Sequence, residues 1–341
     1  MSDDTYRAMT VTGHRRFDLV QRERREPAPG QVRIEVEACG VCRTDELAVD
    51  GLRADPQTPL VPGHEIIGVI SAVGPGVDDS WRAGDRVGVG FLGGQDNTCQ
   101  ACRRGDFVNC TDQPLTGTGV DGGYAEVTYA RATGLVRIPH GTDPLNEAPL
   151  LCAGLTVYNA LLSGRARPGS LVAVQGIGGL GHLGIQYAKA LGYRVAAIAR
   201  GTAKATLATE LGADEFIDST VTDPGAALQK LGGAAVIVAT SAAGSAMSAL
   251  VPGLGRRGEL VVVGADPEPL QIRPADLIFG GHTVRGSLTG TSIENEDNLE
   301  FARRHGVRSY NEVFPLSEAA EAYQRMISGE ARFRVVLDPN G

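Results

Sequence analysis

Residues 171–181 read Leu171-Val-Ala-Val-Gln-Gly-Ile-Gly-Gly-Leu-Gly181 and give the clearest indication of how the central part of this chain folds. Its apolar start predicts a buried strand, and the glycines that follow fit the pattern G-x-G-x-x-G. Gly176 permits a tight turn, Gly178 lets the backbone approach a pyrophosphate, and Gly181 lets the next helix pack closely on the strand. The sequence therefore predicts a dinucleotide site at a helix N-terminus, and a purely structural turn is the alternative. The predicted contact residues are Gly176, Ile177, Gly178, Gly179, Leu180 and Gly181.

Strands and helices alternate on the C-terminal side of this turn. An amphipathic helix carries Leu180, Leu183, Tyr187 and Leu191, and another helix is predicted at about 202–211. Further strands are predicted at 195–199, 215–217, 235–239, 260–263 and 283–286. Apolar strands that alternate with helices predict an α/β domain with a doubly wound parallel sheet.

The flanking regions have a different pattern. Residues 1–150 are β-rich, and segments such as 32–37 alternate apolar and polar residues, as half-buried strands do. The tail adds a predicted helix at about 317–328 and a strand at 334–337. No linker separates the tail from the central domain, so it could pack back on the N-terminal part.

The end of the second predicted strand bears on the choice of cofactor. A site for NAD usually offers Asp or Glu there, but this chain reads Ala199-Arg-Gly-Thr-Ala-Lys204. Arg200, Thr202 and Lys204 could bind a 2′-phosphate by charge and hydrogen bonds. The segment thus favours NADP(H), and the alternative is that these are solvated surface residues and NAD(H) is used.

Two groups of residues have the chemistry of zinc sites. Cys42, His64 and Cys152 combine two thiolates with an imidazole and leave one coordination position open, as catalytic zinc requires. Asp45, three residues past Cys42, could accept a hydrogen bond from the His64 ring. The second group, Asp96, Cys99, Cys102 and Cys110, has the spacing of a structural zinc loop with Asp96 as fourth ligand. A loop of free thiols is the alternative there.

Composition excludes several classes of protein. The 341 residues carry a net charge of −8, so general nucleic-acid binding is not expected. No apolar run is long enough to span a membrane, and the first residues lack a secretion signal. We therefore expect a cytoplasmic location and a small-molecule substrate.

Taken together, these motifs resemble the zinc-dependent alcohol dehydrogenases of the medium-chain dehydrogenase/reductase superfamily. The resemblance rests on GVCRTD, GHE, the cysteine loop, CAGLT and GIGGLG, and it covers essentially the whole chain. It implies a GroES-like β-rich catalytic domain at 1–154 and 289–341, with a Rossmann domain inserted at 155–288. It also implies a homodimer or homotetramer.

The resemblance also implies individual roles. Cys42, His64 and Cys152 correspond to the catalytic zinc ligands, and Glu65 lies near the metal. Thr44 corresponds to the hydroxyl that binds the substrate oxygen, and Thr156 to a residue beside the nicotinamide. Arg43 and Arg334 correspond to arginines that reach the pyrophosphate. Leu52 and Phe91 lie in segments that line the substrate pocket of related enzymes, although both could be ordinary core residues.

The chain departs from the family pattern in three places. Asp96 replaces the first of four cysteines in the loop, Leu47 stands where many members have a proton-relay histidine, and the acidic residue after the second strand is missing. The resemblance predicts hydride transfer between NAD(P) and aliphatic or benzylic alcohols. The alternatives are a zinc-free quinone or enoyl reductase and a non-catalytic protein that binds nucleotide and zinc.

Overall fold

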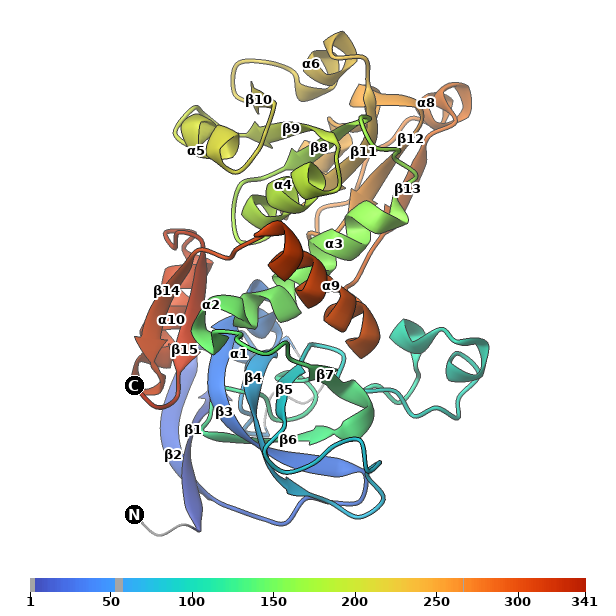
Figure 1. Cartoon of the computed structure of the whole chain (residues 1–341). Coiled ribbons are helices and arrows are strands. Elements are labelled where there is room, and N and C mark those ends of the chain that lie inside the picture. Colours follow the sequence, from blue (N-terminus) through green and yellow to red (C-terminus); the bar gives the residue numbers. More distant parts are fainter. Residues whose placement is uncertain (1–3, 53–57, 266) are drawn as a thin grey trace. The chain divides into compact units, whose positions relative to one another are not determined.

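The computed structural model describes residues 4–52, 58–265 and 267–341, and the chain divides into two compact units (Figure 1). Unit 1 comprises Met1–Cys152, Gly290–Phe301 and Ser309–Gly341, and unit 2 comprises Ala153–Thr289 and Ala302–Arg308. The sequence placed 302–308 with the N-terminal part. These residues, the last turn of α9 (Ser292–His305) and the three residues after it, group instead with unit 2.

Unit 2 contains a six-stranded sheet in which every strand pair is parallel. The strand order is β10-β9-β8-β11-β12-β13, so the first two crossovers run one way from β8 and the later ones run the other way. This is the order of a doubly wound nucleotide-binding sheet, and it confirms the fold predicted for this segment. The strands are β8 (Leu171–Gln175), β9 (Arg194–Ala199), β10 (Glu215–Asp218), β11 (Ala234–Ala239), β12 (Leu254–Val262) and β13 (Thr283–Gly286).

Helices cover this sheet because its central strands are apolar and buried on both faces. The central strand β8 is buried along its whole length, and in Figure 1 α3 and α4 lie on one side of the strands and α6 on the other. The helices are α3 (Ala153–Ser163), α4 (Gly181–Ala190), α5 (Ala205–Glu210), α6 (Pro224–Lys230), α7 (Gly244–Ser248) and α8 (Pro274–Gly280). Ligands of such sheets bind where the crossover direction reverses, which here is at the carboxyl ends of β8 and β11.

Unit 1 is built around a sheet of the order β14-β15-β3-β4-β5-β7, to which β6 adds by pairing with β3. Strands from both ends of the chain lie side by side in it, because β15 pairs with β3. A two-stranded ribbon, β1–β2, completes the strands described in this unit. The strands are β1 (Thr5–Gly13), β2 (Arg16–Glu23), β3 (Gln31–Val41), β4 (Glu65–Val73), β5 (Arg86–Val89), β6 (Val127–Arg131), β7 (Leu135–Arg137), β14 (Asn311–Pro315) and β15 (Arg334–Asp338).

The helices of unit 1 are short, apart from α9 and α10. They are α1 (Glu46–Val49), α2 (Pro144–Glu147), α10 (Ala319–Ile327) and the first part of α9. The core beneath them joins alternate residues of the strands with one face of α10, including Ile34, Ile66, Tyr124 and Tyr323. The β-rich N-terminal part and the returning tail are thus as the sequence predicts.

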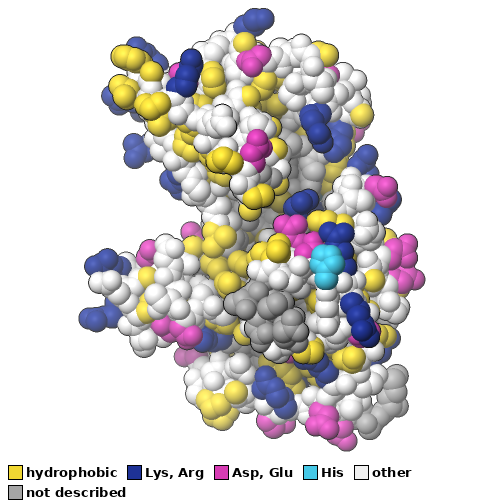
Figure 2. All heavy atoms as spheres, turned by 180° about the vertical axis from the view of Figure 1, so that it is seen from behind, with side chains coloured by type: hydrophobic (Ala, Val, Ile, Leu, Met, Phe, Trp, Pro, Cys, Tyr) yellow, Lys and Arg dark blue, Asp and Glu magenta, His cyan; other side chains and the backbone are white. Residues whose placement is uncertain are grey.

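The surface shows no dominant charge on the face drawn in Figure 2, where basic and acidic side chains are interspersed among uncharged ones. Within the described residues, no helix combines the length and apolar character that a membrane crossing requires.

Candidate active site

The structure brings four residues of unit 1 together in one buried cluster. Ligand atoms of Cys42, His64, Glu65 and Cys152 all lie within 4.8 Å of one another. The two thiol sulfurs are 4.0 Å apart although 110 residues separate them in the chain. Cys42 ends its strand region just before a short 3₁₀ turn, His64 immediately precedes β4, and Cys152 precedes α3. The set predicted from separate motifs therefore forms one site.

Asp45 and Tyr124 contact the ligand residues of this cluster and fix their positions. Asp45 Oδ1 lies 3.0 Å from His64 Nδ1, and both side chains are fully buried. The other carboxylate oxygen, Asp45 Oδ2, accepts hydrogen bonds from the Cys42 backbone N–H (2.9 Å) and from the Tyr124 hydroxyl (2.8 Å). The sequence predicts the role of Asp45 but gave no signal for Tyr124, because a lone tyrosine in a β-rich segment carries no motif.

Glu65 and Arg334 form a buried ion pair beside the thiols, with Arg334 Nη2 donating to Glu65 Oε1. The ion pair puts Arg334 at this cluster, where it is only 3% exposed. Burial raises the pKa of Glu65 to about 7, although the Arg334 charge opposes the shift. The second oxygen, Glu65 Oε2, has no hydrogen-bond partner among the described residues and remains available as a donor to a cation.

The electrostatics of the cluster favour a bound cation. The hydrogen bond from Cys152 lowers the pKa of Cys42 well below its usual value against the effect of burial, and His64 lowers it further. Burial tends to lower the pKa of His64, but Asp45 and Cys42 raise it well above its usual value. Neither nitrogen of the His64 ring has a well-directed hydrogen bond in the described part of the chain. Two sulfurs and an unpartnered imidazole nitrogen are the donors that Zn²⁺ takes, so the residues fit a zinc ion.

Cys152 is positioned by two buried asparagines that no sequence motif indicates. Asn295 Nδ2 donates to the carbonyl of Leu151 (2.8 Å), and Asn298 Nδ2 donates to that of Leu150 (3.0 Å). Both asparagines lie on α9 and are at most 1% exposed. They satisfy the carbonyls of the turn that leads into Cys152. Their only signal in the sequence is the i, i+3 spacing of two polar residues on one helix face.

The other residues predicted near the substrate or cofactor in unit 1 differ in their exposure and contacts. Thr44 is half-buried, and its hydroxyl has no hydrogen bond among the described residues. Phe91 packs edge-on against His64 with ring centroids 5.2 Å apart. Leu47 is half-buried, whereas Leu52 is 65% exposed. Arg43 is exposed and lies 3.6 Å from Glu46.

The second predicted metal group also converges, in a lobe that projects from unit 1 (Figure 1, teal). Ligand atoms of Asp96, Cys99, Cys102 and Cys110 lie within 4.8 Å of one another. Asp96 Oδ1 accepts the backbone N–H groups of Thr98 (2.7 Å) and Cys99 (2.9 Å). Backbone N–H groups also point at two of the sulfurs, from Cys102 to Cys99 and from Asp96 to Cys110. Three thiols and a carboxylate in a loop held by N–H groups fit a closed structural zinc site.

In unit 2, the glycine turn has the geometry that its sequence predicts. Gly176 has φ +89°, which favours glycine, and a Cβ on Gly181 would come 1.7 Å from the Gly176 carbonyl oxygen. A Cβ on Gly178 would meet no described atom within 4 Å, so space lies open beside this backbone. The turn leads from β8 into α4, whose first N–H groups can bind phosphate. Thr156, on α3, is buried with its hydroxyl 3.5 Å from the Leu288 carbonyl.

The segment after β9 lies against this turn. Lys204 Nζ donates to the carbonyl of Ile177 at 2.6 Å, so its ammonium group sits at the predicted phosphate site. Arg200 and Thr202 are exposed. Asp218, at the end of β10, accepts the Gly201 backbone N–H and both donors of Thr220 through one oxygen, Oδ1. Asp218 therefore fixes the loop after β9, and Lys204 is the cation of this segment that contacts the turn.

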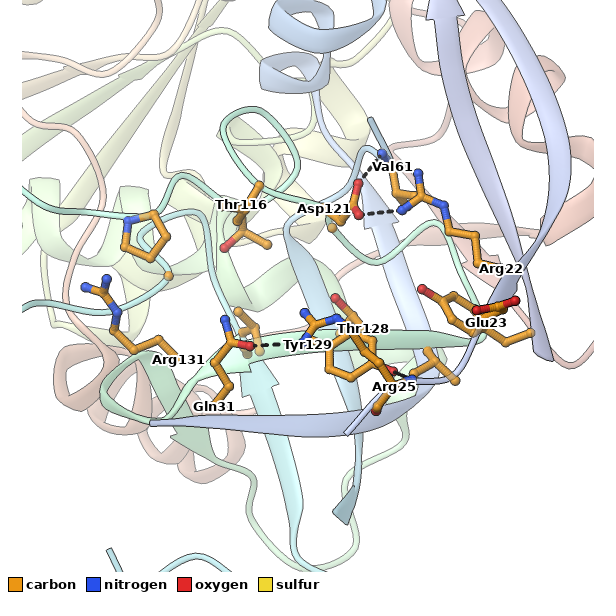
Figure 3. A pocket seen from close by; sticks show the side chains of 18 residues that line it. Arg22, Glu23, Arg25, Gln31, Val61, Thr116, Asp121, Thr128, Tyr129 and Arg131 are labelled. Carbon is orange, nitrogen blue, oxygen red and sulfur yellow. Dashed lines mark hydrogen bonds and ion pairs between the residues drawn. The ribbon is translucent and has the colours of Figure 1, made fainter. Parts of the chain in front are cut away.

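A further cavity of about 650 Å³ lies in unit 1 (Figure 3). Arg25 stacks over the Tyr129 ring at 3.9 Å at this cavity. Asp121 accepts from the Val61 backbone N–H and pairs with Arg22. None of the predicted site residues lines it.

Known proteins match the chain over nearly its whole length. Residues 28–140 match the alcohol dehydrogenase GroES-like domain, and 179–304 match the zinc-binding dehydrogenase model. Alcohol dehydrogenase notN of Aspergillus sp. (strain MF297-2) is 46% identical over 312 residues, 91% of either chain. Two solved structures each have 26% identity and a TM-score of 0.86. CAD from Helicobacter pylori, with NADP(H), covers 98% of both chains, and acetophenone reductase from Geotrichum candidum, with NAD, covers 99% of this chain and 98% of that one. The GroES-like fold of the N-terminal part is thereby confirmed.

Proposed function

Since this chain belongs to the zinc-dependent alcohol dehydrogenases of the medium-chain dehydrogenase/reductase superfamily, we propose that it transfers hydride between NADP(H) and aliphatic or benzylic alcohols and aldehydes. Alcohol dehydrogenase activity, zinc and a nicotinamide cofactor follow from the family. The zinc-free reductase and the non-catalytic protein lose their support with this membership. What we propose beyond the family is the role of each site residue, the preference for NADP(H) over NAD(H) and the class of alcohol that is the substrate.

The buried donor cluster carries the proposal. Cys42, His64 and Cys152 would hold the catalytic zinc, with Glu65 as a fourth donor that can exchange with an incoming ligand. When bound there, zinc polarises the oxygen of an alcohol or carbonyl compound. Arg334 limits the competition from Glu65, because it pairs with one of the two carboxylate oxygens.

Thr44 is proposed as the first proton acceptor. Its hydroxyl lies two residues after Cys42 and has no competing hydrogen bond among the described residues. It can therefore accept the substrate proton and donate its own proton onward. Leu47 carries no group that could continue the relay, so the proton would leave through the cofactor ribose hydroxyl and water, or through another group. Phe91, which packs on His64, would give the pocket an apolar wall.

The preference for NADP(H) is proposed from the cations at the glycine turn. Lys204 bonds the turn itself, and Arg200, directly after β9, is exposed without an ion pair in the described ranges. No carboxylate follows β9 directly, so a 2′-phosphate would meet no repulsion from that position. Arg43 and Arg334 are proposed to contact the pyrophosphate, and Thr156 the nicotinamide, on the family resemblance alone.

Three further proposals concern the rest of the protein. The lobe with Asp96, Cys99, Cys102 and Cys110 would hold a structural zinc. The chain would form a homodimer or homotetramer, since β13 is an edge strand and the nearby Ile278 and Phe279 are 73% and 81% exposed. Five thiols in zinc sites would need a reducing compartment, which supports a cytoplasmic location. Light scattering tests the assembly, and cell fractionation tests the location.

Initial rates with primary, secondary and benzylic alcohols, measured with NAD⁺ and NADP⁺ side by side, test the main proposal. Cys152→Ala should abolish alcohol oxidation because it removes a zinc ligand. Turnover of the panel with higher kcat/KM for NADP⁺ supports the proposal. An equal or higher kcat/KM with NAD⁺ contradicts the cofactor preference. Retained activity in the Cys152→Ala variant contradicts the zinc site.

A further inference from the structure

We infer that Tyr124 is a positioning residue for the catalytic zinc, and that its hydroxyl acts through Asp45 on the His64 ring. The inference rests on the proposed zinc site of Cys42, His64 and Cys152, and it goes beyond it by assigning a role to a residue outside the ligand set. Its basis is a continuous chain of contacts in unit 1 among groups that are almost completely buried.

The Tyr124 hydroxyl fixes one oxygen of Asp45. It donates to Asp45 Oδ2 at 2.8 Å, and the Cys42 backbone N–H donates to the same oxygen at 2.9 Å. Two donors on one oxygen leave Asp45 Oδ1 as the oxygen nearest the ring, 3.0 Å from His64 Nδ1, in an ion-pair contact rather than a well-directed hydrogen bond. A carboxylate held in this way would fix the orientation and tautomer of the imidazole and leave Nε2 as the nitrogen available to a metal. Tyr124 and Asp45 are both fully buried, so water cannot replace the tyrosine hydroxyl without repacking.

The backbone around Tyr124 fastens the segment that leads to His64. Three N–H groups, of Gly122, Gly123 and Tyr124, donate to the carbonyls of Val61, Gly63 and Pro62, at 2.7, 3.1 and 3.0 Å. Figure 3 shows a fourth link, in which the Asp121 carboxylate accepts the Val61 backbone N–H at 2.9 Å. Segment 121–124 therefore holds segment 61–63 along its length.

The Tyr124 ring also explains the glycine before His64. Gly63 has φ +97°, and a Cβ there would lie 2.4 Å from Tyr124 Cδ1. The ring thus packs directly on the residue that precedes the ligand. Since the ring and the hydroxyl act separately, replacing Tyr124 by Phe keeps the packing and removes only the bond to Asp45.

The test compares Tyr124→Phe with the matched control Tyr129→Phe. The Tyr129 hydroxyl bonds only the backbone of Arg25, on another part of unit 1, among the contacts of described residues. Both zinc-loaded variants are mixed with a chelating dye, and zinc release is followed by absorbance. We expect one zinc of Tyr124→Phe to leave about tenfold faster than in the unmodified protein, while the other zinc and the control are unchanged. The d–d absorption of protein with Co²⁺ in the catalytic site should shift for Tyr124→Phe alone.

A double-mutant cycle separates positioning from general loosening. If Tyr124 acts through Asp45, Tyr124→Phe should add nothing to Asp45→Asn, whereas independent effects would multiply. If Tyr124→Phe does not fold, two other variants still test this series of contacts. Asp45→Asn removes the carboxylate between Tyr124 and His64. Asp121→Asn loosens segment 61–63, which should shift the same bands of the cobalt spectrum. Unchanged zinc release and an unchanged spectrum in folded Tyr124→Phe overturn the inference. An unchanged spectrum in Cys152→Ala overturns the proposed zinc site instead.

Discussion

At the scale of single residues, the buried pair Arg334–Glu65 has the largest expected effect on stability. Its side chains are 4% and 0% exposed. Arg334→Ala leaves the Glu65 carboxylate buried without its partner, so we expect a loss of about 3–5 kcal/mol in the free energy of unfolding. Urea denaturation measures it. Replacing both residues by apolar ones, as in Arg334→Met with Glu65→Leu, should recover much of the loss, and an equally unstable double variant would contradict this account.

Arg200 is the residue that tests cofactor choice. A charge-assisted hydrogen bond to the 2′-phosphate contributes about 1.5 kcal/mol or more, so Arg200→Ala should weaken NADP⁺ binding by about tenfold or more. Binding of NAD⁺ should change little. Fluorescence titration with both cofactors measures this difference. Arg194→Ala is the matched control, because Arg194 lies at the other end of β9 and pairs with Glu215.

The residue scale also shows what the sequence could reveal of the site. Cys42, His64 and Cys152 are chemically distinctive, so spacing and residue type suffice to nominate them. Tyr124 and Asn295 are common residues whose roles depend on a hydrogen bond across 79 and 144 positions of the chain. No local pattern encodes such a contact, and only the assembled fold reveals it.

At the scale of elements, the cysteine lobe depends on its carboxylate ligand. Asp96→Ala removes one proposed ligand and the acceptor of two backbone N–H groups. We expect the zinc content to fall from two to about one per chain, because a three-thiolate site lacks its fourth donor. Metal analysis after gel filtration measures it. Asp106→Ala is the control, since Asp106 bonds only the Asn109 side chain among the described residues through its carboxylate. A content near one zinc in fully active unmodified protein would contradict the structural site.

The pair that links β14 to α10 makes stability depend on pH. The hydrogen bond from Arg325 lowers the pKa of Glu312 against the opposing effect of burial, and the Arg332 backbone N–H lowers it further. Because the folded pKa is depressed, the stabilisation is present above the unfolded value of about 4.3 and is lost as the pH falls through the folded value. Glu312→Gln should therefore cost about 0.5–1 kcal/mol at pH 7 and almost nothing near pH 3. Urea denaturation at both pH values measures the difference, and an equal cost at both would contradict it.

Strands and helices that bury apolar side chains can be predicted from the sequence more readily than those that bury polar ones. Strand β11 is apolar throughout its length and β8 is apolar up to its last residue, Gln175, so their residue type alone predicts them. The sequence does not predict helix α9, because α9 buries Asn295 and Asn298 beside Leu299 and its apolar periodicity is weak. A helix that buries amides to bind carbonyls cannot be recognised from hydrophobic pattern.

At the scale of the whole molecule, ligands should act on stability according to the unit that holds their residues. The glycine turn and Lys204 lie in unit 2, whereas both metal clusters lie in unit 1. A ligand that binds only the folded chain stabilises it by about 2.7 kcal/mol at one hundred times its Kd. We expect NADP⁺ to raise the Tm by several degrees, and NAD⁺ at equal concentration to raise it less.

Chelation of zinc should lower the Tm of the same protein, because folded-state binding free energy is lost with the metal. The increase caused by NADP⁺ should persist after chelation, since the turn residues include no metal ligand. Scanning calorimetry with and without chelator, at matched NADP⁺ and NAD⁺ concentrations, measures both effects. If chelation abolished the NADP⁺ effect altogether, nucleotide binding would depend on the metal cluster. The glycine turn and the loop after β9 would then not be enough to bind the nucleotide by themselves. The proposed contacts of Arg43 and Arg334 with the pyrophosphate would contribute more of the binding affinity.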